Sequence, residues 1–342
     1  MTVFATEIIA WQKLHGRHNL PWQTKLNHAP DPYAIWVSEI MLQQTQVSAV
    51  IGYYAKFMLR FPDIKSLANA TQEQVLQHWS GLGYYSRARN LHNAAQKIVD
   101  DFSGDGLNIK FPQNFEDILS LPGIGRSTAA AISTFAFNQP MPILDGNVKR
   151  VFARHFNIAG WPGLPKIEAH MWQIAAYENP HQDAIAYTQG LMDLGATICV
   201  RTKPKCAICP VNASCAALAN NMVSLLPTPK PRKVIPERNT YMLLYMNGND
   251  VMLQKRNNTG IWGGLWSFPE AENLPENGEL ISKLTHTFTH FKLHIQPVLI
   301  QTTKQAMLPN SLWIPIDEAI EAAIPTAVRK ILLTLATKKA AQ

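Results

Sequence analysis

The chain has 342 residues, which is long for one domain and comfortable for two. Its hydrophobic residues, 46% of the total, can supply ordinary cores, and no apolar run approaches the length of a membrane span. The N-terminus lacks a basic segment followed by an apolar core, so we expect no signal peptide and a cytoplasmic location. A formal net charge of +7 favours a polyanionic partner, although charge alone is weak evidence.

Two helices are predicted near the N-terminus. Apolar residues recur at helical spacing between Phe4 and His15, and a second helix is predicted from about Tyr33. Glu39 falls in the strongly apolar part of this second helix. A lone glutamate on a helix is most often solvated. Apolar neighbours would instead raise its pKa and keep the carboxyl protonated, as a general acid requires.

Two stretches between predicted helices have residues that suit contact with nucleic acid. Gln43 and Gln44 begin a polar patch in apolar surroundings, which by itself also fits a plain surface turn. Farther on, Gly81 and Gly83 let the backbone come close to a partner, and the ring of Tyr84 can stack between bases.

Helical periodicity continues to about residue 195 without a clear alternating strand. We therefore predict an all-α domain over residues 1–222. The further helices predicted in it span residues 66–78, 86–101, 115–119, 147–157, 166–177 and 181–195.

A glycine-rich hairpin is predicted at Leu121–Ala129, within a helix-hairpin-helix element over residues 119–135. Gly123 and Gly125 allow a tight turn between helices, and Ser127 and Thr128 stand where the next helix begins. Unpaired backbone N–H groups at such a helix start suit a phosphate oxygen. An ordinary connection between two helices is the alternative, and a Gly-x-Gly pattern by itself favours that alternative.

The residues that follow this hairpin favour the anion-binding interpretation. Asp145 stands beside Gly146 and Asn147, and Lys149 and Arg150 come next. An acid among basic residues, just after an anion-binding hairpin, suits chemistry on a phosphate-linked sugar.

The cysteines lie close together in the sequence, within a loop over residues 199–215. This clustering argues for a metal site in a reducing compartment and against disulfides. A four-thiolate zinc site is one interpretation, and the spacing alone does not exclude it. The cysteines are Cys199, Cys206, Cys209 and Cys215.

A proline-rich basic linker is predicted over residues 223–239, because alternating prolines fit neither a helix nor a central strand. Beyond it, the sequence predicts a small α+β domain over residues 240–342. Its expected strands are 241–245 and 251–253, joined by a hairpin turn, and an alternating strand at 291–295. Its expected helices are 317–323 and 326–336. Its segment Gly260–Trp266 resembles Nudix-fold domains. The run of glutamates that a Nudix hydrolase needs to hold Mg²⁺ is missing, so we expect this domain to bind rather than to catalyse.

Taken together, the motifs resemble those of the helix-hairpin-helix DNA glycosylases, related to endonuclease III. Ser38–Val47, Gly81–Tyr85, Leu121–Ala129, the cysteine spacing and Asp145 are similar to the adenine DNA glycosylases of the MutY kind. The resemblance runs from about Trp11 to the end of the chain. It implies a monomeric base-excision-repair enzyme that releases adenine paired with 8-oxoguanine, or with guanine, from duplex DNA.

The resemblance also implies roles for particular residues. Glu39 would protonate the departing adenine, Asp145 would stabilise the cationic sugar, and Asn147 would orient water or Glu39. Ser127 stands where the bifunctional relatives carry the lysine that breaks the strand, so a monofunctional enzyme is expected. The residues expected to contact DNA are Gln43, Gln44, Tyr84, Gly123, Gly125, Ser127, Thr128 and Lys149, with either glutamine as the wedge that fills the space left by adenine.

Two cofactors and a lesion-reading loop follow from the same resemblance. The four cysteines would hold one 4Fe-4S cluster, and a structural monovalent cation would bind at the hairpin. Phe288, Thr289 and His290 match the loop by which the family contacts 8-oxoguanine, with threonine in place of the usual serine.

Three rival functions stay open at this point. An oxidised-pyrimidine glycosylase is disfavoured by Ser127 and by the second domain. A non-catalytic lesion-binding protein is disfavoured by the joint presence of Glu39 and Asp145, and a Nudix phosphohydrolase by the missing glutamates.

Overall fold

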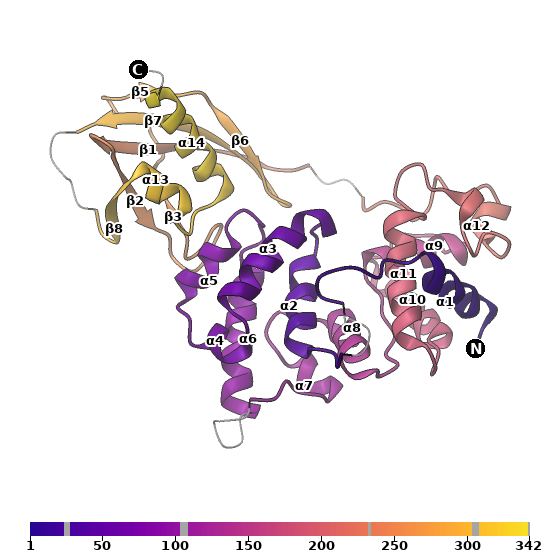
Figure 1. The fold of residues 1–342 in the computed structure, drawn as a ribbon. Coiled ribbons are helices and arrows are strands. Elements are labelled where there is room, and N and C mark those ends of the chain that lie inside the picture. Colours follow the sequence, from indigo (N-terminus) through magenta and orange to yellow (C-terminus); the bar gives the residue numbers. More distant parts are fainter. Residues whose placement is uncertain (24–27, 103–108, 232–233, 303–307, 341–342) are drawn as a thin grey trace. The chain divides into compact units, whose positions relative to one another are not determined.

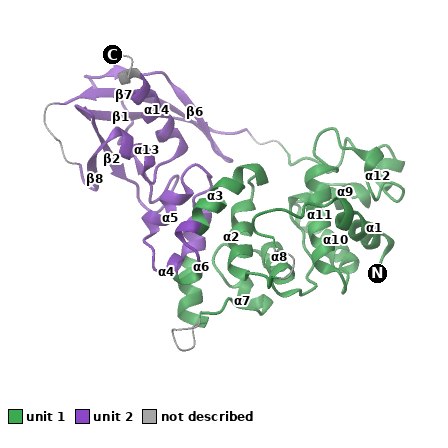
Figure 2. Ribbon diagram, viewed as in Figure 1, with its two compact units in different colours: residues 1–58, 63–65, 93–232 green, residues 59–62, 66–92, 233–342 purple. Residues whose placement is uncertain are grey.

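The computed structural model describes residues 1–342 except 24–27, 103–108, 232–233, 303–307 and 341–342. The chain divides into two compact units, shown in green and purple in Figure 2. Unit 1 comprises residues 1–58, 63–65 and 93–232, and unit 2 comprises residues 59–62, 66–92 and 233–342. The division at residues 232 and 233 falls inside the predicted linker, whereas residues 66–92 belong with the C-terminal part of the chain.

The first part of the chain is helical, as predicted: no strand occurs before residue 237 in the segments that the structure describes. One helix was missed, at Val47–Arg60, and the helix predicted over residues 66–78 is two helices separated at Thr71, which caps the second. The helices are α1 Val3–His15, α2 Pro32–Leu42, α3 Val47–Arg60, α4 Ile64–Ala68, α5 Gln72–Trp79, α6 Ser86–Phe102, α7 Phe115–Leu119, α8 Arg126–Phe137, α9 Gly146–His155, α10 Pro165–Glu178, α11 Ala184–Thr197 and α12 Ala216–Ala219, with a short 3-10 turn at Cys206–Ile208 (Figure 1).

Two helices of unit 1 begin at an aspartate that caps them. Asp31 accepts hydrogen bonds from the backbone N–H groups of Tyr33 and Ala34, and Pro32 occupies the first turn, where its missing N–H leaves no bond unmade. Asp145 caps α9 in the same way by accepting from the Val148 N–H at 2.7 Å. The start of each helix is therefore fixed by local sequence.

Helix α11 is packed closely by α1 and α9 at two glycines. A methyl group added at Gly190 would stand 2.7 Å from a side-chain carbon of Ile8. One added at Gly195 would stand 2.6 Å from Cβ of Asn147. Asp193 lies between these two contacts on the same helix and is 1% exposed.

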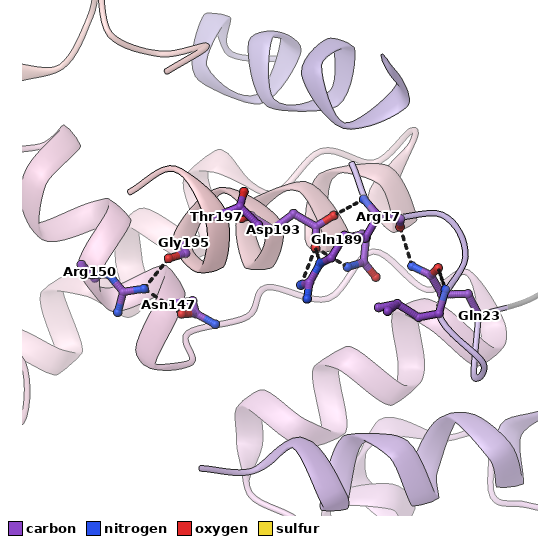
Figure 3. A network of polar contacts seen from close by, with 9 residues as sticks. Arg17, Gln23, Asn147, Arg150, Gln189, Asp193, Gly195 and Thr197 are labelled. Atoms are coloured by element: carbon purple, nitrogen blue, oxygen red, sulfur yellow. Dashed lines mark hydrogen bonds and ion pairs between the residues drawn. The ribbon is translucent and has the colours of Figure 1, made fainter. Parts of the chain in front are cut away.

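Asp193 fixes the loop that follows α1. Its carboxylate accepts from the Arg17 backbone N–H at 2.8 Å, from Arg17 Nε at 2.6 Å and from Gln189 Nε2 at 2.8 Å (Figure 3). Arg17 in turn uses its carbonyl oxygen to accept from Gln23 Nε2 at 2.7 Å. Removing one partner of a buried ion pair typically costs about 3–5 kcal/mol, so this pair holds the segment 17–23 firmly.

The first half of the predicted linker is attached to unit 1. Arg154 donates to the carbonyl oxygens of Val223 and Leu226, and the Gly160 N–H donates to Thr228 Oγ1 at 3.1 Å. The predicted linker is therefore bound to unit 1 along these residues. The last three residues of the predicted linker, 237–239, belong to the first strand of the C-terminal sheet.

The C-terminal part of the chain is α+β, as predicted. Its mixed sheet has the order β3-β2-β1-β7-β5, with β4 beside β1, β6 beside β7 and β8 beside β2. Helices α13 and α14 lie on one face of it (Figure 1). The elements are β1 Glu237–Asn247, β2 Asp250–Lys255, β3 Trp266–Ser267, β4 Glu270–Ala271, β5 Glu279–Leu280, β6 Leu284–Thr287, β7 Lys292–Gln301, β8 Ser311–Pro315, α13 Ile316–Glu321 and α14 Thr326–Ala340.

The predicted hairpin and the predicted alternating strand are both confirmed. Asn247 pairs with Asp250 across the tight turn between β1 and β2. In β7, Leu293 and Ile295 are buried, and the residues that alternate with them are less so. Strand β7 runs parallel to β1 and antiparallel to β6, so the turn 288–291 is the tip of the β6–β7 hairpin.

Candidate active site

The candidate site of unit 1 is built around Glu39 on α2. Its half-buried carboxyl has a pKa raised to about 8, first because burial disfavours the charged form and second because the Asp145 carboxylate is near. At neutral pH the group therefore carries a proton. This is the state that a general acid needs.

Asp145 differs from Glu39 in its surroundings. Burial raises the pKa of Asp145, but hydrogen bonds from the backbone N–H groups of Val148 and Asn147, and the charge of Arg150, oppose that rise. Its place at the N-terminus of α9 also favours the ionised form. Two neighbouring carboxyls in unlike environments are the usual basis for separate acid and anion roles.

A cavity of about 560 Å³ opens beside Glu39 within unit 1. Its walls come from α2, α8, α11 and the loop that Arg17 and Asp193 fix. Trp22 supplies a buried aromatic surface and meets Tyr54 edge to face at 5.3 Å between ring centroids. The polar groups of the cavity are Gln12, His18, Gln23, His28, Ser38, Glu39, Asn138, Asp183 and Gln189.

Arg150 connects the start of α9 to α11 and to the cysteine loop. It donates from Nη2 to Asn147 Oδ1 at 2.8 Å and to the Gly195 carbonyl oxygen at 2.5 Å, and from Nε to the Cys199 carbonyl oxygen at 2.7 Å. Figure 3 shows Arg150 reaching both Asn147 and Gly195. The Asn147 side chain is thereby held two residues after Asp145, within the first turn of α9.

Only one of the two hairpin glycines adopts the left-handed backbone, since Gly125 is extended with φ of −96°. Gly123 has φ of +80°, and Gly125 is the N-cap of α8 without any side-chain cap, so backbone N–H groups at this helix start are left for a ligand. Ser127 Oγ accepts from the Leu144 N–H at 3.1 Å, which ties α8 to the residue before Asp145.

The two candidate wedge residues are placed differently. Gln43 Nε2 lies 3.4 Å from the Gly123 carbonyl oxygen and 3.3 Å from Thr128 Oγ1, so its amide faces the hairpin. Gln44 is exposed and has φ of +58°, a conformation uncommon outside glycine. Lys149 forms an ion pair with Glu168 at 2.7 Å.

All four cysteines line one small cavity in unit 1. Arg154, 4% exposed, braces the loop by donating to the Val200 and Arg201 carbonyl oxygens, and its Nη1 lies 3.4 Å from Cys199 Sγ. Burial raises the pKa of the Cys209 thiol to about 11. Among the residues that the structure describes, no three His, Cys, Asp or Glu side chains already stand in an arrangement that could hold a metal.

Unit 2 carries the predicted lesion-reading loop. Thr289 and His290 are exposed at the tip of the β6–β7 hairpin, which the Phe288 N–H closes by donating to the Phe291 carbonyl oxygen at 2.9 Å. This loop and Tyr84 line the same cavity, of about 1280 Å³, within unit 2. Tyr84 is 46% exposed and has φ of +49°, after Gly81 and Gly83, which also have positive φ.

Sequence analysis missed several residues that shape these sites. Arg150 stands three residues after Asn147, a helical spacing that could have indicated their contact. The segment Leu20–Gln23 gave no signal that its tryptophan would line the cavity of Glu39. The Arg17–Asp193 pair joins residues too distant in sequence for any local pattern to find.

Two family models match the chain. Residues 37–176 match the HhH-GPD superfamily of base excision DNA repair proteins, and residues 240–334 match the NUDIX domain. The first match covers the Glu39 helix, the hairpin and Asp145. The second covers the sheet and the Phe288–His290 loop.

Whole proteins of the same organisation are similar to this chain. The adenine DNA glycosylase of Buchnera aphidicola subsp. Acyrthosiphon pisum (strain APS) is 37% identical over 96% of this chain and 97% of that protein. The adenine DNA glycosylase of Homo sapiens is 31% identical over 97% of this chain and 73% of that protein.

Solved structures reproduce the helical part of the fold. A thermostable thymine-DNA glycosylase is 28% identical with a TM-score of 0.56, covering 64% of this chain and 96% of that one. An endonuclease III in a non-covalent complex with DNA has a TM-score of 0.51 over 64% of this chain and 95% of that one, at 18% identity.

Replacing Gly195 by alanine is expected to destabilise the protein by about 1–3 kcal/mol, because the new methyl group would overlap Asn147 and push α9 from α11. Urea unfolding measures the change. Gly52→Ala on α3, where a methyl group meets nothing within 4 Å, is the matched control and should stabilise by about 0.5–1 kcal/mol. Equal stability of the two variants would contradict the close packing described here.

Replacing Glu39 by glutamine is expected to change how stability depends on pH. Folded Glu39 keeps its proton up to about pH 8, whereas the unfolded carboxyl loses its proton near its ordinary value. Since the folded state binds more protons between these values, the free energy of unfolding of the native protein falls as pH rises through that window. Glu39→Gln should therefore be the more stable protein at pH 9, by an amount that shrinks towards pH 4.

Thermal unfolding at a series of pH values measures this difference. Glu318→Gln, which changes an exposed carboxyl on α13, is the control for the loss of one charge. Parallel pH profiles for Glu39→Gln and the native protein would show that the carboxyl is not perturbed.

Proposed function

The chain belongs to the adenine DNA glycosylases, and on that premise we propose that it removes adenine paired with 8-oxoguanine from duplex DNA, with adenine opposite guanine as a second substrate. The reaction hydrolyses the N-glycosidic bond and leaves an abasic site. The observation that carries the proposal is a protonated Glu39 beside Asp145 at the edge of an aromatic-walled cavity.

Glu39 acts as the general acid in this proposal. The glycosidic bond is inaccessible inside a duplex, so adenine must leave the stack and enter the cavity beside Glu39. Protonation of adenine at N7 converts a poor leaving group into a neutral one. The raised pKa of Glu39 supplies a carboxyl that still has its proton at neutral pH.

Asp145 stabilises the positive charge that develops on the sugar as the bond breaks. Capping of α9 and the charge of Arg150 favour its ionised form. Asn147, held by Arg150, orients water or Glu39. Water then attacks the sugar carbon and completes the hydrolysis.

The DNA backbone is bound at the hairpin. A phosphate accepts hydrogen bonds from the backbone N–H groups around Gly123 and Gly125 and at the start of α8, at Ser127 and Thr128. Lys149 adds positive charge. A monovalent cation at the hairpin remains a prediction from the family.

Gln44 is the wedge that fills the space left by adenine, because its side chain is exposed whereas the Gln43 amide faces the hairpin. Tyr84 stacks between bases beside the lesion. Ser127 has a hydroxyl and cannot form an imine, so the enzyme releases the base without breaking the strand.

Reading of 8-oxoguanine is assigned to Phe288, Thr289 and His290. Guanine offers an acceptor at N7, whereas 8-oxoguanine offers an N–H donor at that position. The Thr289 hydroxyl is assigned to accept from this N–H, which guanine lacks, and its exposure at a hairpin tip lets it reach a base.

The four cysteines are assigned to one 4Fe-4S cluster from the family resemblance, and this is supported by their lining one cavity and by the cationic Arg154 near Cys199. Bound there, the cluster supplies structure by fixing the loop 199–215. Zinc in a four-thiolate site is the alternative.

The proposed organisation follows the sequence: a catalytic domain over residues 1–222, a linker over 223–239 and a recognition domain over 240–342. We infer a monomer that works where the genomic DNA is. The structure has no helix that is both long and apolar enough to cross a bilayer, among the residues it describes.

A single-turnover assay on three duplexes tests the function. Adenine opposite 8-oxoguanine and adenine opposite guanine should both lose adenine, with the strand intact until alkali is added, and thymine glycol opposite adenine should be untouched.

Glu39→Gln should lower excision by about 10²–10⁴ because it removes the general acid. Thr289→Val should reduce the preference for 8-oxoguanine roughly ten-fold and leave the guanine mispair unchanged. Release of thymine glycol, or no release of adenine, would reject the proposal.

Metal analysis tests the cluster. The protein purified without air should contain about four iron and four sulfide per chain with broad visible absorbance. Arg154→Met should lose iron, because the loop that carries Cys199 loses its brace, whereas Arg201→Met, at an exposed position, should keep it. Stoichiometric zinc in place of iron would support the alternative.

A further inference from the structure

The turn Gly260–Trp266, singled out in the sequence as Nudix-like, has a tryptophan in an unusual conformation. Trp262 has φ of +56° and is 7% exposed. A bulky residue in the left-handed region is an outlier, and such backbone strain persists only where the surrounding structure enforces it. The position of this side chain is therefore determined by its neighbours.

The ring of Trp262 packs against the predicted lesion-reading loop. Its centroid lies 5.4 Å from that of Phe288 and 5.3 Å from that of His286. Phe288 itself lies stacked on Phe291 at 4.6 Å, directly beside the exposed Thr289 and His290. Trp262 thus supports the loop through its contacts with Phe288 and His286.

The same turn is attached to helices α5 and α6 within unit 2. Glu73 on α5 accepts from Lys255 Nζ at 2.7 Å and from Trp266 Nε1 at the end of the turn. Arg89 on α6 donates from Nη1 to the Gly263 carbonyl oxygen at 2.8 Å. Helix α5 also packs closely against Gly264, where an added methyl group would stand 3.0 Å from Gln72 Nε2.

Tyr84 lies in the connection between these two helices. The Gly83 carbonyl oxygen accepts from Trp79 Nε1 on α5 at 3.1 Å and from Arg87 Nη2 on α6 at 3.2 Å, which fixes the residue before Tyr84. The guanidinium of Arg87 also stands 5.5 Å from the centroid of the Tyr84 ring. The turn 260–266 therefore bridges the helices that present Tyr84 and the loop that presents Thr289.

We propose that Trp262 is a positioning residue for lesion discrimination, holding Phe288-Thr289-His290 at a fixed distance from Tyr84 through the Glu73-anchored turn 260–266. This rests on the proposed function. The turn keeps its Nudix-like sequence for this mechanical purpose, since the acidic residues of a hydrolase are missing. A hydroxyl that must distinguish one hydrogen atom on a base needs its loop held to within a fraction of an ångström.

Four variants of the full-length protein test the role. Trp262→Ala removes the ring from Phe288 and should lower the preference for adenine opposite 8-oxoguanine over adenine opposite guanine by roughly three- to ten-fold. Trp262→Phe keeps an aromatic ring and should restore most of it. Glu73→Ala loosens the turn from α5 and should lower the preference in the same direction, although Glu73 does not line the cavity. Gln77→Ala is the matched control, because Gln77 bonds the Glu321 carbonyl oxygen and not the turn.

The readout is the ratio of single-turnover rates on the two mispairs, with the affinity for an abasic-site analogue opposite 8-oxoguanine or guanine as a second measure. Excision from the guanine mispair should stay within about two-fold for all four variants, since the Glu39 site is untouched. A double-mutant cycle of Trp262→Ala with Phe288→Ala should be non-additive, because both changes remove the same contact.

Native preference in Trp262→Ala would overturn the proposal. So would an equal loss in Gln77→Ala, which would indicate general loosening. Should Trp262→Ala fail to fold, native preference in folded Glu73→Ala would overturn it as well. Thr289→Val in the same assay separates the positioning role from the proposed function. If Thr289→Val loses the preference for 8-oxoguanine and Trp262→Ala keeps it, the positioning role fails and the proposed function stands.

Discussion

Burial of the Glu39 carboxyl, with the Asp145 carboxylate nearby as a second cause, raises the pKa of Glu39 to about 8, and this desolvation is the constraint on which unit 1 depends. A carboxyl with a pKa of about 8 destabilises the folded state once the pH exceeds its ordinary value. Capping of α9 and the charge of Arg150 oppose the rise that burial causes in the pKa of Asp145. The two neighbouring carboxyls therefore differ in the groups that surround them.

Holding that arrangement requires contacts from distant parts of the chain. Helix α9 approaches α11 closely because Gly195 has no side chain, and Arg150 then bonds Asn147, the Gly195 carbonyl and the Cys199 carbonyl at once. The cysteine loop and the start of α9 are consequently one connected structure. Whatever fixes the cysteine loop therefore also acts on the start of α9.

Unit 2 contains α5 and the start of α6 together with the Nudix-like sheet. Glu73, Ser80, Tyr85 and Arg89 all bond groups beyond residue 255, so the helices that present Tyr84 and the sheet that presents Thr289 form one compact body. Under the proposed function this arrangement gives Tyr84 and Thr289, the two residues assigned to the lesion strand, a common support.

The sequence alone determined what depends on neighbours along the chain. Aspartate and proline at the start of α2, the glycines of the hairpin and the turn at Asn247–Asp250 act through local dihedral preferences, and the helical first part, the α+β second part and the family followed from them. The roles of Glu39, Asp145 and Thr289 remain predictions. Only the tertiary structure decided the docked linker, the bonds from Arg150 to Gly195 and Cys199, the Arg17–Asp193 pair and the strained Trp262. Each of these depends on groups tens to hundreds of residues apart, which no local pattern encodes.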